Sequence, residues 1–304
     1  MEVRHDFTRT SERPLVLAIG FFDGFHRGHR EIARRTLRMR RPGWRSGVLT
    51  FSNHPATHLR PGTEPPLIST PQERLDLFAS AGFDECFFVR FDDRIATLEP
   101  QAFLDILVER LHVAAVGVGA TFRFGHKRAG DTTQMADYLA RRQATFIGVE
   151  PIVHDGERIS STRIRSLVAA AELAQADELL AGTGYEIRGP VEIGEGRGHA
   201  LGFPTANIRV PEKLLPKDGV YSAVARYDGR DYAALVSIGS NPHFGGQHRT
   251  VEAWLRDFQQ SIYGREVALR DLRWVREQRL FADVGELIEQ MQLDRAAVGY
   301  PAYG

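Results

Sequence analysis

A chain of 304 residues exceeds the usual size of one domain, so two domains are expected. Its 39 basic residues balance 39 acidic ones, which argues against a nonspecific nucleic-acid binder held by a basic face. The one cysteine excludes an intrachain disulfide and fits a reducing compartment. No apolar signal core stands at the N-terminus, and no apolar run approaches the roughly 18 residues of a membrane span. We therefore expect a cytoplasmic protein that binds neither nucleic acid nor membrane, with homo-oligomer formation left open.

The first informative stretch is an apolar run followed by a glycine-rich turn that carries two histidines. Leu15–Ile19 predicts a strand, residues 20–29 a turn, and residues 29–39 an amphipathic helix. Such a turn points backbone N–H groups and a helix N-terminus at its ligand, which favours a polyphosphate. His26 and His29 stand three residues apart, so both imidazoles can flank one anionic group. The pattern suits nucleotidyl transfer, in which charge grows on the α-phosphate and the departing pyrophosphate.

Two other interpretations of this turn compete with the phosphate site. The turn could be a flavodoxin-like strand-to-helix corner with incidental histidines, because glycine-rich corners are common. It could also be a zinc site, but Cys86 is the only cysteine and no further cluster with ligand spacing accompanies the histidines. With Asp23, both histidines and the flanking glycines placed behind a strand, we favour the phosphate site.

Strand and helix alternate from Leu15 to about Val149, which predicts an α/β doubly wound parallel-sheet domain. The clearest helix begins at Thr70 as N-cap, with a capping-box glutamate at Glu73, and ends at Gly82. Ligands bind beyond the carboxyl ends of such strands, so the turns after the first, second and fourth strands should converge. The five expected strands are Leu15–Ile19, Gly47–Phe51, Glu85–Val89, Ala114–Val118 and Thr145–Val149.

The turns at these strand ends carry further candidate side chains. His54 before Pro55 could donate to a phosphate or cap a turn. Phe122 and Phe124 alternate around Arg123, which suits a planar aromatic ligand bearing a phosphate. The two phenylalanines could equally be core anchors of a long loop.

A second anion grip is expected at residues 158–165, before two short helices. Ser160, Ser161 and Thr162 supply three hydroxyls at a helix start, where capping needs one. Arg163 and Arg165 follow, and arginine near a helix N-terminus opposes the helix dipole unless an anion lies between. This stretch could therefore close over a triphosphate opposite the histidine pair.

The sequence pattern changes at residues 181–184, from alternating strand and helix to short strands separated by turns. Runs of strands without intervening helices predict an antiparallel barrel or sandwich, and Asp228-Gly229 signals a hairpin. We expect domains at 1–183 and 184–304, the second ending in a helix at about 284–293. The expected strands are Tyr185–Ile193, Asn207–Val210, Gly219–Tyr227, Asp231–Ile238, Thr250–Phe258 and Glu266–Val275.

Together these stretches resemble the bacterial bifunctional riboflavin kinase and FAD synthetase family, from about Pro14 to Val298. The resemblance implies a C-terminal β-barrel that phosphorylates riboflavin to FMN with ATP, and an N-terminal domain that transfers AMP from ATP to FMN, giving FAD and pyrophosphate. Magnesium would accompany ATP, and the flavins would be substrates and products. The matching segments are 22–29, 50–55, 122–125, 159–165, 196–198, 201–207, 219–221 and 250–252.

The resemblance also assigns residues in the N-terminal domain. The FMN phosphate is already a nucleophile, so catalysis there needs positioning and electrostatics rather than a base. His26, His29 and Arg165 are the candidate catalytic residues that hold the triphosphate. The ATP-binding candidates are Gly20, Phe22, Asp23, Gly24, Gly28, Ser161 and Thr162, and the flavin-binding candidates are Asn53, His54, Phe122, Arg123, Phe124 and Gly125.

In the barrel the ribityl 5′-hydroxyl must lose a proton, and the resemblance assigns that task to Glu252. Its neighbours Val251 and Ala253 should point to the opposite sheet face; a lone strand glutamate is otherwise most often a solvated side chain. The resemblance implies magnesium ligands at Thr205 and Asn207. ATP phosphates would be bound by Gly196, Arg197 and Gly198.

Three departures from the family pattern bear on activity. Phe21 stands where relatives usually carry Asn, Ser52-Asn53 replaces the usual lead-in to His54, and His243 stands where relatives carry Thr. An enzyme that retains only one activity is therefore an alternative. A non-catalytic flavin or nucleotide sensor is another alternative. A sensor would need none of the proposed catalytic side chains, so their presence argues against it.

Overall fold

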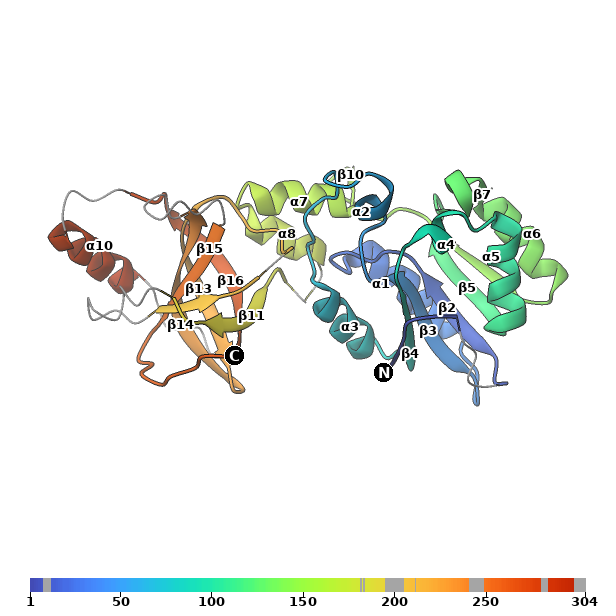
Figure 1. Ribbon diagram of the computed structural model, residues 1–304, viewed down its shortest axis with the longest axis horizontal. Helices are drawn as coiled ribbons and strands as arrows, with labels where there is room; N and C mark the ends of the chain where they lie inside the picture. The colour runs from blue at the N-terminus through green and yellow to red at the C-terminus, as the bar shows by residue number, and fades with distance from the viewer. Residues whose placement is uncertain are drawn as a thin grey trace. The chain divides into compact units, whose positions relative to one another are not determined.

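The computed structural model describes residues 1–7, 12–180, 182, 184–194, 205–210, 212–240, 249–279 and 284–297. The chain divides into two compact units, Met1–Ser161 and Thr162–Gly304. Figure 1 colours the chain from blue at the N-terminus to red at the C-terminus. None of the helices in the described ranges is long and apolar enough to cross a membrane.

The N-terminal unit is built on a six-stranded parallel sheet with the strand order β1-β4-β3-β2-β5-β8. All five expected strands are confirmed, and β1 is an edge strand that the sequence did not predict, because its exposed residues show no apolar pattern. The strand order reverses beside β2, so β2 and β5 border the switch point where doubly wound sheets bind ligands. The strands are β1 Glu2–Arg4, β2 Leu15–Ile19, β3 Arg45–Phe51, β4 Glu85–Val89, β5 Val113–Gly119 and β8 Thr145–Val149.

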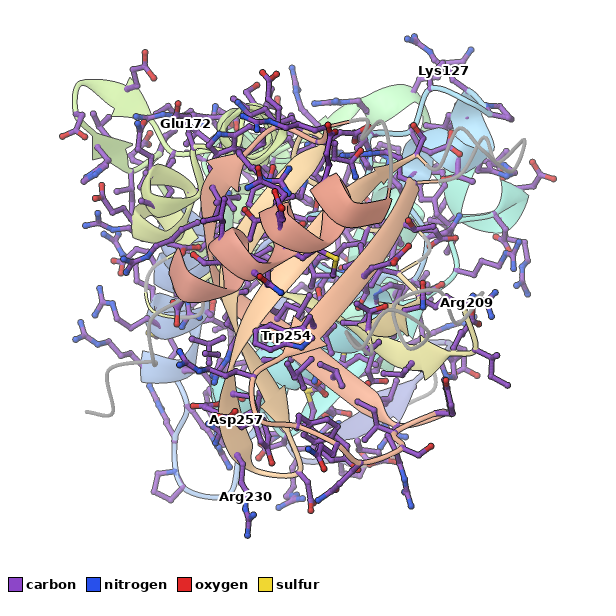
Figure 2. All side chains as sticks on the ribbon, turned by 90° about the vertical axis from the view of Figure 1, so that its left-hand side faces the viewer. Lys127, Glu172, Arg209, Arg230, Trp254 and Asp257 are labelled. Carbon is purple, nitrogen blue, oxygen red and sulfur yellow. The ribbon has the colours of Figure 1, made fainter. Side chains whose placement is uncertain are left out.

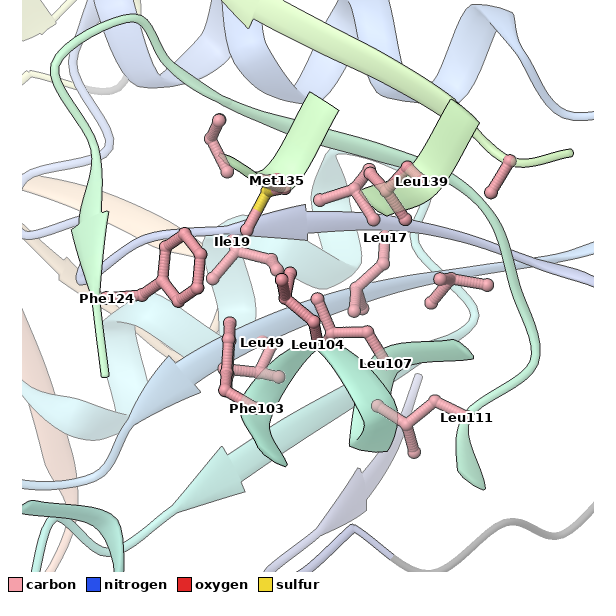
Figure 3. Close-up of a cluster of buried hydrophobic side chains, with 14 of the residues drawn as sticks. Leu17, Ile19, Leu49, Phe103, Leu104, Leu107, Leu111, Phe124, Met135 and Leu139 are labelled. Atoms are coloured by element: carbon pink, nitrogen blue, oxygen red, sulfur yellow. The ribbon is translucent and has the colours of Figure 1, made fainter. Parts of the chain in front are cut away.

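Helices cover both faces of this sheet because its strands are apolar on both sides. Helices α1 (Arg27–Arg38) and α3 (Pro71–Ser80) pack on one face around Val48 and Phe78. Helix α5 (Pro100–Asp105), the π-helix η1 (Ile106–Arg110) and α6 (Thr132–Arg141) cover the other. Figure 3 shows that second core, where Leu17, Ile19, Leu104 and Met135 meet. Shorter elements are α2 Pro55–Leu59, α4 Asp93–Ala96, β6 Arg123–Phe124, η2 His126–Arg128, β7 Gly130–Asp131, β9 Val153–His154 and β10 Glu157–Arg158.

The capping box predicted for α3 is present. The Thr70 Oγ1 accepts from the Glu73 backbone N at 3.2 Å, and a Glu73 carboxylate oxygen accepts from the Thr70 N at 2.9 Å. Two N–H groups that the helix itself cannot satisfy are therefore bonded, so α3 starts where the sequence predicted.

The C-terminal unit is a closed antiparallel barrel with the strand order β11-β12-β15-β14-β13-β16, preceded by two helices. The barrel rather than the sandwich is therefore observed, and closure removes the exposed strand edges of an open sheet. The predicted hairpin is confirmed, with Asp228 and Gly229 both at positive φ, 47° and 74°. The elements are α7 Ser161–Ala169, α8 Leu173–Leu180, β11 Ile187–Glu192, β12 Thr205–Ile208, β13 Gly219–Tyr227, β14 Arg230–Ser240, β15 Arg249–Leu255, β16 Glu266–Arg276 and α10 Val284–Ala297.

Small and branched apolar side chains fill the barrel. Ala234, Val236 and Ile238 on β14 are fully buried, and Ala253 on β15 faces them. Figure 2 looks onto the barrel, with Trp254 near the middle of its wall. The alternating residues of each strand therefore point outward, and this outer face carries the polar residues considered below.

Candidate active sites

The turn after β2 lies at the switch point and carries the first set of candidate residues. Phe22, Gly24 and Phe25 all adopt positive φ, 57°, 79° and 39°. A left-handed residue other than glycine costs about 1–3 kcal/mol, so two phenylalanines need compensation. Their rings are 2% and 1% exposed and meet Phe78 edge-on. Burial of the two rings stabilises a turn that the backbone alone would not adopt, and the turn leads directly into His26.

His26 begins helix α1 and stacks on His29. The Nδ1 of His26 accepts from the His29 backbone N at 3.3 Å, and the ring centroids are 3.6 Å apart. A Cβ on Gly28 would lie 3.1 Å from the His26 ring, so glycine leaves the room that this pair needs. Because Nδ1 is the acceptor, the neutral His26 ring carries its proton on Nε2 and can donate it to an anion.

Both imidazoles are neutral at pH 7. Burial, and then the positive charge of Arg158, lowers the pKa of His26 to about 4. Burial, and then His26, lowers the pKa of His29 well below its usual value. The His29 residue is half-buried overall, and its Nδ1 atom is buried and makes no hydrogen bond within the described residues. The pair therefore offers neutral ring nitrogens, rather than fixed charges, to a ligand.

Arginines supply the positive charge around this pair. The exposed Arg158 at the end of β10 acts on His26, and Arg27 Nη1 lies 3.2 Å from His154 Nδ1. Arg158 was not among the predicted site residues, although it is the first residue of the second predicted anion-binding stretch, residues 158–165. The Ser161 Oγ donates to the Asp23 carbonyl at 2.9 Å, so the structure brings the part of that stretch up to Ser161 to the histidine turn. Thr162 and Arg165 belong to the C-terminal unit, and their part in the grip stays a prediction.

The Asp23 side chain points into the fold. It is 1% exposed, and its carboxylate accepts from the backbone N of Ser69 at 2.9 Å and of Ile68 at 3.2 Å. The carboxylate thereby holds the chain before α3 and presents no negative charge to a phosphate. Gly20, Phe22, Gly24 and Gly28 lie in the same turn, where backbone groups rather than side chains are the available ligands.

The turn after β3 meets the turn after β2, as expected. The Thr50 Oγ1 donates to the Phe21 carbonyl at 3.0 Å, and the Phe21 and His54 rings meet edge-on at 4.8 Å. His54 caps α2 by accepting from the Ala56 N at 3.1 Å. Asn53 bonds both backbone groups of Phe91, at 3.1 and 2.8 Å, which ties the ends of β3 and β4 together.

The loop after β5 holds the remaining flavin candidates. Phe124 is 6% exposed and packs 5.4 Å from the Phe103 ring, so it is an anchor of the core in this structure. Phe122 is half-buried and stacks on Phe124 with a centroid distance of 6.0 Å. Arg123 pairs with Asp131 at 3.2 Å, and Gly125 turns the chain at a φ of 73°. Of the flavin candidates in this loop, the half-buried Phe122 and the exposed Arg123 are the side chains that reach the surface.

The barrel assembles the second candidate site through strand register. Asn207 on β12 stands directly opposite Glu252 on β15, and Glu252 stands opposite Ser237 on β14. Directly opposed residues of antiparallel strands share a sheet face. Val251 is 1% and Ala253 0% exposed, which confirms that Glu252 points away from the interior. The polar row on the outer barrel wall is therefore Asn207, Glu252 and Ser237.

Thr205 lies two residues before Asn207 and so on the same face. A Cβ on Gly194 would fall 2.0 Å from the Asn207 Nδ2, so the chain after β11 passes closely over the row. Hydroxyl and amide oxygens beside a carboxylate are the hard donors that a divalent cation accepts, so these residues fit a magnesium ion. Ser237 was not predicted, because no local pattern reveals register. Gly196, Arg197, Gly198 and His243 lie outside the described residues.

The two units match two known enzyme families. The profile of FAD synthetase matches residues 8–163, and that of riboflavin kinase matches residues 181–299. The fold and the matches thus define a flavin nucleotidyltransferase joined to a flavin kinase.

Whole-chain relatives carry both activities in their names. The chain is 36% identical over 284 residues to a bifunctional riboflavin kinase/FMN adenylyltransferase of Listeria monocytogenes, covering 92% of this chain and 90% of the relative. It is 32% identical over 293 residues to the Escherichia coli K12 enzyme so described, covering 95% and 93%. The chain belongs to the bifunctional riboflavin kinase/FMN adenylyltransferase family, and it is an enzyme of flavin cofactor biosynthesis.

A solved structure shares the fold. It is described as a macrolide-efflux protein from Streptococcus pneumoniae, and it matches with a TM-score of 0.86 at 28% identity, covering 98% of this chain and 99% of that one. That description concerns the Streptococcus protein, and the likeness supports the architecture described above.

Proposed function

We propose that AMP transfer from ATP to FMN takes place at the switch point of the N-terminal unit, and that phosphoryl transfer from ATP to riboflavin takes place on the outer barrel wall at Glu252. The observation that carries this division is that each unit holds its own cluster. The stacked histidine pair lies at the start of α1, and the register-aligned pair of Asn207 and Glu252 lies on the barrel.

In the N-terminal unit the nucleophile is the FMN phosphate, which is anionic at neutral pH and needs no base. The site has to bring two anions together, and it does so with donors rather than with a proton acceptor. His26 Nε2 and the His29 ring donate to the triphosphate, Arg158 adds charge and Ser161 adds a hydroxyl donor, while Thr162 and Arg165 remain predicted contacts. As the α-phosphate becomes crowded in the transition state and pyrophosphate departs, these fixed donors stabilise the developing charge.

Several groups orient the flavin for this attack. His54 and Phe21 form an aromatic edge after β2 and β3, and Phe122 with Arg123 forms another after β5. Asn53 and Phe124 support these loops from within, because both side chains are already engaged in the fold.

In the barrel the ribityl 5′-hydroxyl is a neutral nucleophile, so a base is needed. Glu252 is half-buried on the outer wall and takes the proton of that hydroxyl as it attacks the γ-phosphate of ATP. Thr205 and Asn207 would hold magnesium, which when bound neutralises phosphate charge. Gly196, Arg197 and Gly198 remain predicted phosphate contacts. The cytoplasmic location also remains a prediction, as does homo-oligomer formation.

A time course tests this proposal. The full chain is incubated with riboflavin, ATP and magnesium, and the flavins are separated by chromatography. We expect FMN to appear first and FAD to follow. If FMN forms without FAD, the chain has only the kinase activity. If FAD forms only from supplied FMN, the chain has only the adenylyltransferase activity. Neither product at any magnesium concentration would instead favour the flavin or nucleotide sensor.

A further inference from the structure

Arg74 on helix α3 is, among the described residues, the largest side chain that is fully buried, with 0% exposure. Burial of an arginine is energetically unfavourable unless its donors are satisfied, so a buried guanidinium needs a structural reason. Burial lowers the pKa of Arg74 to about 10, which leaves it protonated at neutral pH. The charge of Asp23 opposes part of this lowering, but the guanidinium donates hydrogen bonds to other groups, and its Nε atom is buried without a hydrogen bond within the described residues.

Backbone carbonyls hold the guanidinium instead. The Nη1 of Arg74 donates to the carbonyl of Phe51 at 2.9 Å and to that of Phe21 at 3.1 Å. Phe51 ends β3, and Phe21 lies in the turn after β2. Thr50 Oγ1 donates to the same Phe21 carbonyl. Arg74 thus joins two adjacent chain segments at the carboxyl edge of the sheet, where the ladder hydrogen bonds end.

The flat face of the guanidinium also supports an aromatic ring. Its central carbon lies 4.5 Å from the Phe21 ring centroid and 5.2 Å from that of Phe88. Phe21 in turn meets the His54 ring. Arg74, Phe21 and His54 therefore form a column from the core to the candidate flavin-binding edge.

We propose that Arg74 is a positioning residue for AMP transfer: it fixes the peptide group after Phe21, from which the left-handed turn to His26 begins, and it holds the Phe21 ring as a wall of the site. This inference rests on the proposed place of AMP transfer at the switch point. An apolar side chain could fill the space but would leave the Phe21 and Phe51 carbonyls without this donor. Lysine would keep the charge, but its compact ammonium lacks the flat guanidinium face that stacks on the Phe21 ring.

The chain offers a matched control for loss of a buried arginine. Arg45 is 6% exposed and begins β3 at the opposite, amino edge of the same sheet, where its Nη1 pairs with Glu85 Oε1 at 2.6 Å. Arg74→Lys, Arg74→Met and Arg45→Lys are prepared in the full chain. Each is assayed for FAD formation from FMN, for riboflavin phosphorylation and for thermal unfolding, and the His26 ring is titrated by NMR.

We expect Arg74→Lys to lower kcat/KM for FAD formation about 100-fold at temperatures where the variant is folded, because a displacement of about 1 Å in a site can cost that much. Arg45→Lys should lower the unfolding temperature comparably and leave FAD formation within about twofold. In Arg74→Lys the His26 pKa should rise from about 4 toward its ordinary value as the turn loosens, and in Arg45→Lys it should not move.

Normal FAD formation in Arg74→Lys, an unmoved His26 pKa, or an equal loss of activity in Arg45→Lys would each overturn the inference. If Arg74→Met does not fold, FAD formation by Arg74→Lys and the NMR titration of its His26 ring still test the role of Arg74. His29→Ala separates this test from that of the proposed function. If His29→Ala retains FAD formation, the proposed site is wrong. If His29→Ala loses it and Arg74→Lys retains it, only the role of Arg74 is wrong.

Discussion

The two candidate sites are built in opposite ways. The histidine pair of the N-terminal site comes from one continuous turn, residues 20–29, and stacks at the start of a helix, although the site also draws on later segments. The barrel site is drawn from separate strands, and Asn207 and Glu252 are 45 positions apart in sequence but directly opposed in the ladder. The chemistry explains the contrast in side chains. An anionic nucleophile needs donors, whereas a neutral hydroxyl needs a carboxylate. Variants that remove one kind of group should therefore silence one activity only.

The largest effect is expected from Glu252→Gln. Loss of the base should lower riboflavin phosphorylation by about 10²- to 10⁴-fold, the usual contribution of general base catalysis. FAD formation from supplied FMN should be unchanged, as measured by chromatography of the two products. Glu266→Gln is the control, because Glu266 begins β16 with a side chain that is 60% exposed. Equal loss of both activities in a folded Glu252→Gln protein would contradict the division between the units.

The converse variant is His29→Ala. Removal of one preorganised donor costs about 10²- to 10³-fold in other enzymes, so FAD formation should fall by that order while riboflavin phosphorylation persists. His29→Asn keeps an N–H donor and should recover part of the loss. Steady-state kinetics with FMN and with riboflavin measure the two activities. An undiminished rate of FAD formation in His29→Ala would remove the histidine from the proposed mechanism.

Acid should destabilise the N-terminal unit through its histidines. The folded-state pKa of His26, about 4, lies below its ordinary value of 6.5. The unfolded chain therefore binds more protons between these two pH values. The contribution of neutral His26 to the free energy of unfolding is fully present above about pH 6.5 and is lost as the pH falls through 4. The full loss for His26 amounts to about 3 kcal/mol, since one pKa unit corresponds to about 1.4 kcal/mol.

The acid effect can be located by measurement. Denaturant unfolding is followed between pH 7 and pH 4, and His26→Gln should flatten the dependence. Trp254 and Trp274 lie on barrel strands, so with Trp44 of the N-terminal unit replaced by Phe their fluorescence follows the barrel, and it should change less over this range than the N-terminal unit does. A barrel that unfolds first on acidification would reverse the comparison.

The smallest effect is expected from Gly28→Ala. The added Cβ would lie 3.1 Å from the His26 ring, which must then shift by a few tenths of an ångström while both imidazoles are retained. FAD formation should fall about tenfold, because geometry rather than chemistry is changed. Gly43→Ala is a poor control since its φ is 82°, whereas Gly119→Ala has a loose contact of 3.8 Å and should be near neutral. A larger loss in Gly119→Ala than in Gly28→Ala would point to general destabilisation.

Local patterns carried most of the fold prediction. Strands β2, β4 and β8 have the predicted bounds, and the Thr70 capping box starts α3 where expected. These features depend on residues a few positions apart, so a single sequence contains their whole signal. Strand β1 was missed because its three residues owe their conformation to pairing with β4, which lies 83 positions further along.

The sequence by itself determined the two-domain organisation of strands and helices, the histidine turn and the identity of the catalytic candidates, because each is written within a short stretch of chain. Only the tertiary structure decided that the Asp23 carboxylate turns into the fold, that Ser237 joins the row of Asn207 and Glu252, and that Arg74 supports the carboxyl edge. These arrangements depend on strand register and on burial by distant segments. Both are set by packing of the whole domain, and no local spacing of residues encodes them.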